Sequence, residues 1–236
     1  IVNGLVGSEM CIRDRIDEEK EIDELILRIK KNEPSLWFNL KDFALNEVLT
    51  SIKDDLKLFN VSFDQWFYES SLGDVNDKES QVAEAINTLK DKELAYEEKG
   101  AIWLNTSSSG DDKNRVLIRD DGRATYFASD VAYHKDKVDR GFNKLINVWG
   151  ADHHGYIKRI EASLDGLGFE KEKLSVQLVQ FANLFKDGKK VKMSTRSGDF
   201  YSLADLIKDI GTDAARFYYL SKQADQHLDF DLDLAK

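Results

Sequence analysis

The amino-terminal part of the chain carries apolar residues at helical spacing. They recur every three or four positions, which places them on one face of a helix. Pro34 ends the first stretch, because proline lacks the backbone donor that a helix interior needs. We expect all three stripes to contact a hydrophobic core. Their members are Ile22, Leu25, Ile26 and Ile29; Phe43, Ala44, Val48, Ile52 and Leu56; and Val82, Ala85, Ile86 and Leu89.

From residue 111 onward, short apolar runs alternate with amphipathic stretches, which is typical of an α/β fold. Asp121-Gly122 predicts a hairpin turn between residues 116–119 and 125–127. A helix should then start with Ser129 or Asp130 near its first turn.

The remaining elements follow from the same pattern. We predict a buried parallel strand, a crossover helix closed by Gly168, a second strand, and two helices, the first with a capping box formed by Ser202 and Asp205. Their expected ranges are 144–149, 156–167, 176–185, 203–210 and 213–222.

Two other features are interpreted as structural. Trp66 and Trp103 should pack rather than bind a substrate. The acidic end of the chain should form a solvated loop that leads into a further domain, although its carboxylates could also suggest a cation site. These carboxylates are Asp225, Asp229, Asp231 and Asp233.

Composition narrows the class of protein. The chain has 236 residues, 42% of them hydrophobic, enough for one sizeable core. No apolar run is long enough to span a membrane, and the formal net charge of -10 argues against a broad nucleic-acid surface. We expect a monomer in the cytoplasm. The single cysteine, Cys11, gives no basis for a disulfide or thiol chemistry.

A basic segment stands out against this acidic background. It has five cations: Lys186, Lys189, Lys190, Lys192 and Arg196. Lysine supplies a compact charge and arginine a two-pronged donor for phosphate oxygens, so the segment could hold a polyphosphate. The alternative is a solvated hairpin whose lysines provide solubility.

The predicted strand at 144–149 is followed by Gly150, Asp152, His153 and His154. Ligands of open α/β sheets bind beyond the carboxyl ends of the strands, where an acidic residue can accept from ribose hydroxyls. The Asp-His-His triplet also resembles the signature of a class of metal-dependent phosphoesterases, and it could equally be a polar turn. His134 and His227 are the only other histidines, which tells against metal; we expect no protein-bound metal.

Tyr126 and Asp130 are four residues apart, so they share a face on a helical backbone. A carboxylate beside a phenol is a suitable receptor for a guanidinium group. The alternative is that Asp130 caps the helix and Tyr126 packs.

Taken together, ordered phrases along the chain resemble the central part of arginyl-tRNA synthetase, a class I aminoacyl-tRNA ligase. They are 63–69 (FDQWFYE), 100–103 (GAIW), 111–116 (DDKNRV), 125–130 (TYFASD), 149–155 (WGADHHG), 192–196 (KMSTR), 213–217 (DAARF) and 227–234 (HLDFDLDL). The resemblance implies an α/β fold, the second half of a class I Rossmann-type nucleotide fold with a helix-rich insertion. The implied regions are an insertion at 16–110, the nucleotide-fold half at 111–211, and a helix and linker at 212–236.

The resemblance also implies roles for particular residues. Tyr126, Asp130 and His153 would bind the arginine side chain and close its pocket. Gly150, Asp152, His154 and Lys192 would contact ATP. The catalytic loop would consist of Lys192, Met193, Ser194 and Arg196 and would stabilise the pyrophosphate.

The implied reaction has two steps. The carboxylate of L-arginine attacks the α-phosphate of ATP, with Mg²⁺ accompanying the nucleotide, and the arginyl group then passes to tRNA(Arg). No protein nucleophile is required, because positioning and charge stabilisation suffice. Thr195 departs from the commonest family pattern, which has a second lysine there, so Lys190 or a residue outside the chain would compensate.

Other departures suggest a piece of an enzyme. No His-x-Gly-His phrase is present, and the anticodon-binding domain expected after Lys236 is absent. Residues 1–15 match nothing in the family and resemble a translated sequencing adapter, so native sequence should begin near Ile16. We therefore expect little activity from this chain alone, and a non-catalytic nucleotide- or tRNA-binding fragment stays an alternative.

Overall fold

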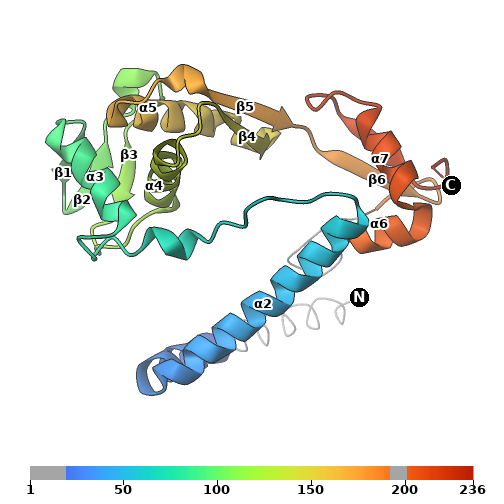
Figure 1. Ribbon diagram of the computed structural model, residues 1–236, viewed down its shortest axis with the longest axis horizontal. Coiled ribbons are helices and arrows are strands. Elements are labelled where there is room, and N and C mark those ends of the chain that lie inside the picture. Colours follow the sequence, from blue (N-terminus) through green and yellow to red (C-terminus); the bar gives the residue numbers. More distant parts are fainter. Residues whose placement is uncertain (1–19, 192–200, 236) are drawn as a thin grey trace, which may run out of the picture. The chain divides into compact units, whose positions relative to one another are not determined.

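The computed structural model describes residues 20–191 and 201–235. The chain separates into two compact units, Ile1–Ser62 and Phe63–Lys236, and each is described by itself. Figure 1 shows their elements along the chain. Among the described residues, we find no helix with both the length and the apolar character that crossing a membrane requires.

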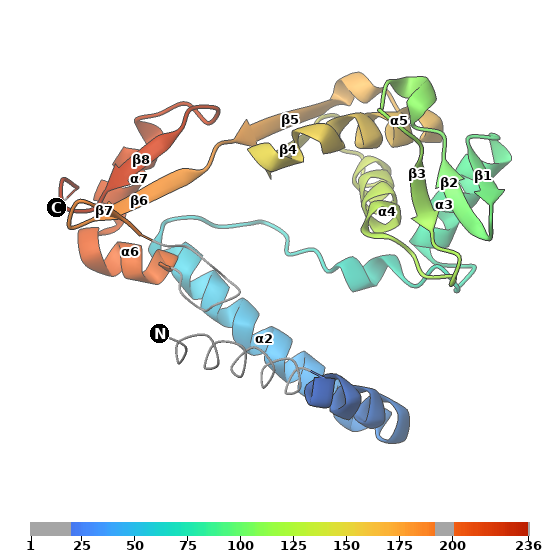
Figure 2. The same cartoon turned by 180° about the vertical axis from the view of Figure 1, so that it is seen from behind.

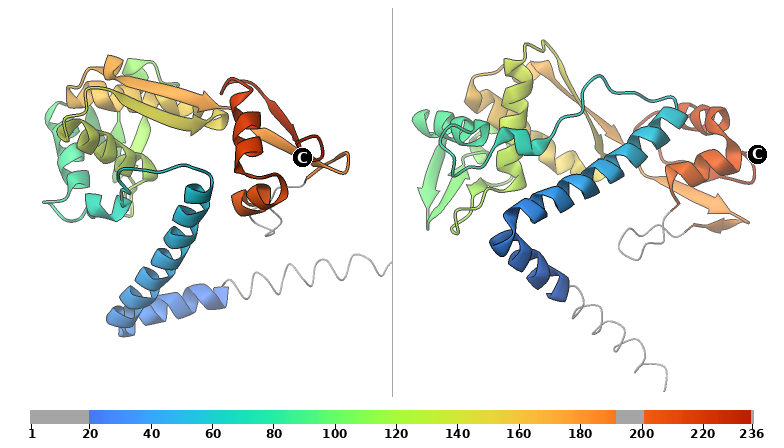
Figure 3. Two further views of the ribbon diagram at one scale, coloured as in Figure 1. Left: turned by 45° about the vertical axis from the view of Figure 1, so that its right-hand side comes forward. Right: turned by 60° about the horizontal axis from the view of Figure 1, so that its bottom comes forward.

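The described part of the first unit consists of helices. Residues 20–32 are helical, and α2, Pro34–Leu58, begins directly after Glu33 (Figure 3). Pro34 thus ends the first helix as predicted and also starts the next one, where its missing N–H has no helical partner to lose.

The core contacts predicted for this unit are wrong for both stripes, since Ile22 of the first stripe is 56% exposed and Leu25 is 45% exposed. No residue of α2 is buried; Phe43 is 66% exposed and Val48 58% exposed. Helical spacing indicates which face of a helix is apolar, but it does not indicate whether another element covers that face.

The second unit begins with a helix and a three-stranded antiparallel sheet of order β1-β2-β3. The third predicted stripe lies on α3, where all four of its members are buried, and Ser80 caps that helix by accepting from the Ala83 N–H. The elements are η1 Glu69–Leu72, α3 Gln81–Asp91, β1 Ala95–Glu98, β2 Ala101–Leu104, η2 Ser107–Ser109, β3 Arg115–Ile118 and α4 Tyr126–Asp139.

A parallel βαβ unit follows, and Figure 2 shows its two strands side by side with α5 next to them. The crossover helix is confirmed, and Gly168 closes it with a φ of 91°, a left-handed conformation that favours glycine. The elements are β4 Leu145–Gly150, η3 Ala151–Tyr156, α5 Ile157–Leu167, η4 Lys171–Lys173 and β5 Leu174–Val179.

The first strand of this unit is parallel as predicted, but it is not buried on both faces. Leu145 and Asn147 are buried, whereas Ile146 is 62% exposed and Val148 67% exposed. Sheet β4-β5 has two strands, and the face that carries Asn147 is the one that packs inward.

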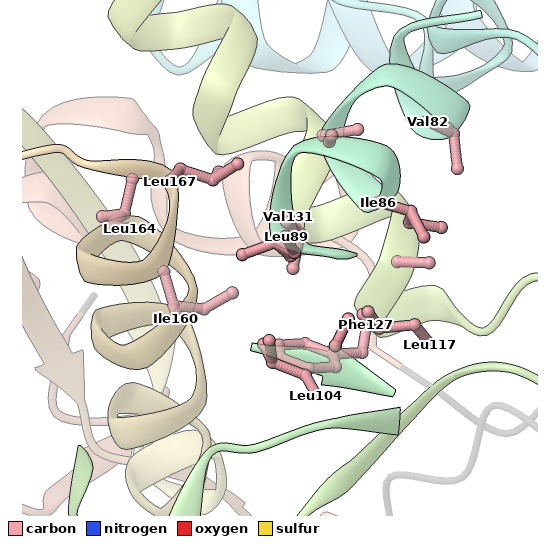
Figure 4. Close-up of a cluster of buried hydrophobic side chains, with 14 of the residues drawn as sticks. Val82, Ile86, Leu89, Leu104, Leu117, Phe127, Val131, Ile160, Leu164 and Leu167 are labelled. Atoms are coloured by element: carbon pink, nitrogen blue, oxygen red, sulfur yellow. The ribbon is translucent and has the colours of Figure 1, made fainter. Parts of the chain in front are cut away.

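Helices α3, α4 and α5 and strands β2 and β3 share one hydrophobic core, which Figure 4 shows in close-up. Val131 of α4 and Ile160 of α5 are fully buried in it. Helices α3 and α5 approach closely at Gly166, where a Cβ atom would lie 2.9 Å from Cδ2 of Leu89. This core holds α4 and the end of β4 in one packed body.

The carboxyl-terminal part forms a separate sheet of order β7-β6-β8 with two helices. The capping box of Ser202 and Asp205 is confirmed, and the rings of Tyr218 and Phe230, on α7 and β8, lie 4.3 Å apart. The elements are β6 Ala182–Lys186, β7 Lys189–Lys190, α6 Leu203–Ile210, α7 Thr212–Leu220 and β8 Leu228–Asp231.

Two predictions for this part are wrong. The single strand expected at 176–185 is two strands, β5 and β6, which belong to different sheets. The acidic end is not a solvated loop, because β8 pairs in parallel with β6 and its Leu228 and Phe230 are buried. The aspartates alternate with these apolar residues, as on a strand with one buried face.

Candidate functional site

Helix α4 places the first candidate residue. Its N-cap is Thr125, whose side chain accepts from the Ala128 N–H and donates to the Val116 carbonyl at 2.9 Å. The predicted turn at Asp121-Gly122 is present, but residues 125–127 start this helix instead of completing a strand. Asp130 therefore lies in the second turn of α4 and not at its cap.

Asp130 lines a pocket of about 260 Å³ between α4 and the segment around η1. A second carboxylate, that of Glu69, lines the same pocket. The complete lining is Phe67, Glu69, Leu72, Ser129, Asp130 and Tyr133. A small pocket with two acidic side chains is suited to a cationic group.

Aromatic rings form one wall of this pocket. Phe67 and Tyr133 stack with their ring centroids 4.2 Å apart and their planes inclined by 24°. The ammonium of Lys137 lies 4.1 Å from the centroid of Tyr133, and the guanidinium of Arg140 lies 5.6 Å from that of Phe67. Such cation–π contacts help to hold the stacked pair in one orientation.

The side chain of Asp130 is fixed by a hydrogen bond from the Tyr156 hydroxyl to its Oδ2 at 2.6 Å. Burial raises the pKa of the Asp130 carboxyl above its usual value; the bond from Tyr156 lowers it, and the nearby charge of Glu69 raises it. Burial also raises the pKa of Tyr156, so this phenol stays a donor. The carboxylate thus carries a charge that its protein surroundings compensate incompletely.

The end of β4 supplies the second group of candidate residues. A Cβ atom at Gly150 would lie 2.5 Å from Oδ1 of Asp152, so glycine allows this carboxylate to fold back against the strand end. Asp152 and His153 lie in η3 and are both exposed, with Oδ2 and Nε2 3.8 Å apart. The ring of His153 is 6.3 Å from that of Tyr156, so His153 and Asp130 both lie next to this tyrosine.

The other predicted site residues are not part of this cluster. Tyr126 lies on the first turn of α4, is 83% exposed, and does not line the pocket. His154 is exposed in η3. Lys192, Met193, Ser194 and Arg196 lie outside the described residues. Within the described ranges, no group of three or more potential metal-ligating side chains occurs.

Sequence reasoning missed Glu69 and Tyr156 as neighbours of Asp130. Glu69 lies in the 63–69 phrase, but nothing in that phrase indicates that it packs next to a helix sixty residues later. The sequence pattern predicts Tyr156 only as the first residue of the crossover helix. A phenol directly after an Asp-His-His-Gly turn was the only available signal.

Comparison with known proteins decides the family. The pattern described as "tRNA synthetases class I (R), catalytic domain" matches residues 14–231. This chain belongs to the class I arginyl-tRNA synthetase family. The resemblance drawn from the sequence phrases is thereby confirmed, and family membership replaces the phosphoesterase interpretation of Asp152, His153 and His154.

Curated relatives agree. The arginine–tRNA ligase of Vesicomyosocius okutanii is 48% identical over 224 residues, which cover 95% of this chain and 38% of that protein. The Nitrosospira multiformis arginine–tRNA ligase is 49% identical over 220 residues, 93% of this chain and 37% of that protein. The chain thus spans less than two fifths of the length of these relatives.

Solved structures show the same fold. A Campylobacter jejuni crystal structure named for arginyl-tRNA synthetase matches with a TM-score of 0.75 at 39% identity, over 89% of this chain and 45% of that one. The Thermus thermophilus arginyl-tRNA synthetase matches with a TM-score of 0.64 at 16% identity, over 88% of this chain and 45% of that one. The α/β fold class, that of the class I synthetase catalytic domain, is confirmed.

Proposed function

We propose that this chain carries the amino-acid pocket and part of the ATP site of an arginine–tRNA ligase. The observation that supports this most is the pocket at Asp130. It combines two carboxylates with a stacked aromatic wall, and its volume of about 260 Å³ suits a guanidinium with part of its alkyl chain.

In the proposed mode of binding, the guanidinium of L-arginine pairs with Asp130 and Glu69. A planar, permanently charged group can donate to a carboxylate in a bidentate manner, which a lysine ammonium cannot. Tyr126 lies one turn before Asp130 with its ring exposed, so its hydroxyl is available to a bound substrate. His153 would close the pocket from the side of Tyr156.

ATP would bind with its Mg²⁺ beyond the end of β4. Gly150 permits close backbone approach, and Asp152 offers an acceptor for ribose hydroxyls, as acidic residues do in related nucleotide folds. His154 would contact the adenosine. The loop of Lys192, Met193, Ser194 and Arg196 would offset negative charge that develops on the pyrophosphate.

The proposed reaction needs no protein nucleophile. The arginine carboxylate attacks the α-phosphate and pyrophosphate leaves. A hydroxyl of the terminal ribose of tRNA(Arg) then attacks the arginyl carbonyl of the adenylate, and AMP leaves. The chain contributes by holding the two reactants in contact and by selecting the side chain. We place this activity in the cytoplasm, where tRNA is charged, in a protein that acts as a monomer.

The test is tRNA-stimulated exchange of pyrophosphate into ATP by the complete gene product. Arginine should support exchange, whereas citrulline, which has a neutral urea group of similar shape, should not. Asp139→Asn is the matched control, because Asp139 lies on the same helix but pairs with Lys135 away from the pocket.

Exchange that depends on arginine, survives in Asp139→Asn and disappears in Glu69→Gln combined with Asp130→Asn would support the proposal. Equal exchange with citrulline and arginine would refute the assigned pocket. ATP binding without exchange under any condition would favour a non-catalytic binding role instead.

A further inference from the structure

A buried polar chain connects α4 to β4 behind the pocket. His134 is 2% exposed and Asn147 is 6% exposed. The ring Nδ1 of His134 lies 2.7 Å from the carbonyl oxygen of Asp130, and its Nε2 lies 2.7 Å from Nδ2 of Asn147. The ammonium of Lys137 donates to Oδ1 of Asn147 at 3.2 Å.

These contacts fix the protonation state of the histidine. A lysine ammonium can only donate, so Oδ1 of Asn147 must face Lys137 and the amide NH₂ must face His134. Nε2 of His134 therefore accepts, and Nδ1 carries the proton that it donates to the Asp130 carbonyl. Burial lowers the pKa of His134 to about 4, so the ring is neutral at pH 7.

A second route from the same strand reaches the side chain of Asp130. Trp149 lies two residues after Asn147 on β4, and its ring is 5.8 Å from that of Tyr156 in an edge-on arrangement. Tyr156 donates to the Asp130 carboxylate. Asp130 is therefore held twice, at its backbone through His134 and Asn147 and at its side chain through Tyr156 and Trp149.

We propose that His134 and Asn147 are positioning residues for substrate selection, which set the place of Asp130 relative to the end of β4. The inference rests on the proposed function, because it assigns Asp130 to the arginine side chain. The two residues touch no substrate. They keep the guanidinium receptor on α4 in register with the strand end that would hold ATP, and a shift of α4 would misplace the carboxylate while leaving the strand end intact.

The experiment measures the KM values for arginine and ATP in the exchange reaction of the complete gene product. His134→Leu and Asn147→Leu should each raise the KM for arginine roughly tenfold, because each breaks the same bond and leaves a buried partner unsatisfied. The KM for ATP should change by less than about twofold. The double variant should be little worse than either single variant, since each single variant already removes the contact between His134 and Asn147.

Two further variants separate positioning from general damage. In His134→Gln the side-chain carbonyl can still accept from Asn147. The KM for arginine should therefore lie between those of wild type and His134→Leu. If the leucine variants do not fold, the KM of His134→Gln tests the inference by itself. Ser163→Ala removes a buried side-chain hydrogen bond on α5 and should leave both KM values unchanged.

Two results would overturn the inference alone: an unchanged KM for arginine in His134→Gln and in whichever leucine variants fold, or a parallel rise of both KM values. Wild-type protein without any arginine-dependent exchange would instead refute the proposed function, and the inference would fall with it.

Discussion

Asp111 and Asp130 are two aspartates of the same packed unit in opposite environments. The side chain of Asp111 is 3% exposed and accepts from both Nε and Nη2 of Arg115, at 2.7 and 2.8 Å, and from Thr106 at 3.0 Å. The Arg115 guanidinium holds the pKa of Asp111 far below its usual value. Asp130 accepts from a neutral phenol, and burial raises its pKa.

The difference indicates what each carboxylate does. Asp111 already has its guanidinium from within the chain, so its charge is matched and its role is to hold the β3 segment to the preceding loop. Asp130 lies in a pocket without such a cation among its lining residues. A partly buried carboxylate without a cationic partner in its pocket favours a ligand that carries a positive charge.

The largest effect should come from Asp130→Asn. The amide keeps the shape but loses the charge that pairs with the guanidinium, so kcat/KM for arginine should fall about a thousandfold. Steady-state exchange kinetics measure this. A fall in kcat/KM of less than about threefold would contradict the comparison, because Asp130 would then contribute no more to arginine binding than Asp111 does.

The same variant should not lose stability. A raised folded-state pKa means that the ionised carboxylate destabilises the fold above that pKa, a penalty that fades as the pH falls through it. Asparagine removes the penalty, so urea unfolding at pH 7 should give an unchanged or higher free energy of unfolding. A clear loss would indicate a structural role.

Asp111→Asn should behave in the opposite way. Removing one partner of a nearly buried ion pair leaves Arg115 with the exposed carboxylate of Asp112 as its remaining ion-pair partner and should lower the free energy of unfolding by about 3 kcal/mol. The KM for arginine should stay within about twofold of wild type in the folded protein. A selective rise in that KM would show that the two carboxylates are not separate in role.

The pH dependence of stability should also reveal the ion pair between Asp111 and Arg115. A depressed folded-state pKa stabilises the protein above the unfolded-state value, and that contribution is lost as the pH falls from about 4 toward the folded-state pKa. Wild-type stability should therefore drop below about pH 4, and Asp111→Asn should flatten the drop. Identical acid unfolding curves would contradict this.

Tyr156→Phe should have a smaller effect, about a tenfold rise in the KM for arginine, because it frees the Asp130 side chain without removing its charge. Tyr96→Phe is the matched control. The hydroxyl of Tyr96, on strand β1, accepts a hydrogen bond from the Asn114 side chain. An equal rise in both variants would mean that the loss of any tyrosine hydroxyl acts through stability.

The smallest effect concerns pH. Protonated Asp130 cannot pair with a guanidinium, so the KM for arginine should rise as the pH falls through the folded-state pKa. Loss of the Tyr156 hydrogen bond raises that pKa further, so in Tyr156→Phe the rise in the KM for arginine should begin at a higher pH. A profile that moves to lower pH would contradict the role given to Tyr156.

Local sequence predicted the elements whose signals are local. Helices α3 and α5 follow from their apolar spacing, and the box at Ser202 and Asp205 marks the start of α6. The sequence could not reveal that nothing in the described first unit covers Phe43, or that Gln180 leaves strand β5 to bond the Ala224 carbonyl and so separates two strands. Both depend on parts of the chain that are distant in sequence.

The residues of the candidate site also divide into those that local sequence predicts and those that it does not. Asp130 could be found because a phrase around it carries the family pattern. Glu69 and Tyr156 could not be found as its neighbours, because their places beside Asp130 depend on packing among η1, α4 and η3. Helical spacing places His134 one turn after Asp130, but the sequence does not reveal its burial or its contact with Asn147.

The most direct test of this account is a ¹³C NMR titration of the side-chain carboxyls of Asp111 and Asp130 in the complete gene product, with and without saturating arginine. We predict that Asp130 titrates above the usual aspartate range and that arginine lowers its pKa, while Asp111 titrates far below that range and does not respond. An Asp130 carboxyl that titrates low and ignores arginine would contradict the central claim that its charge is kept for a cationic ligand.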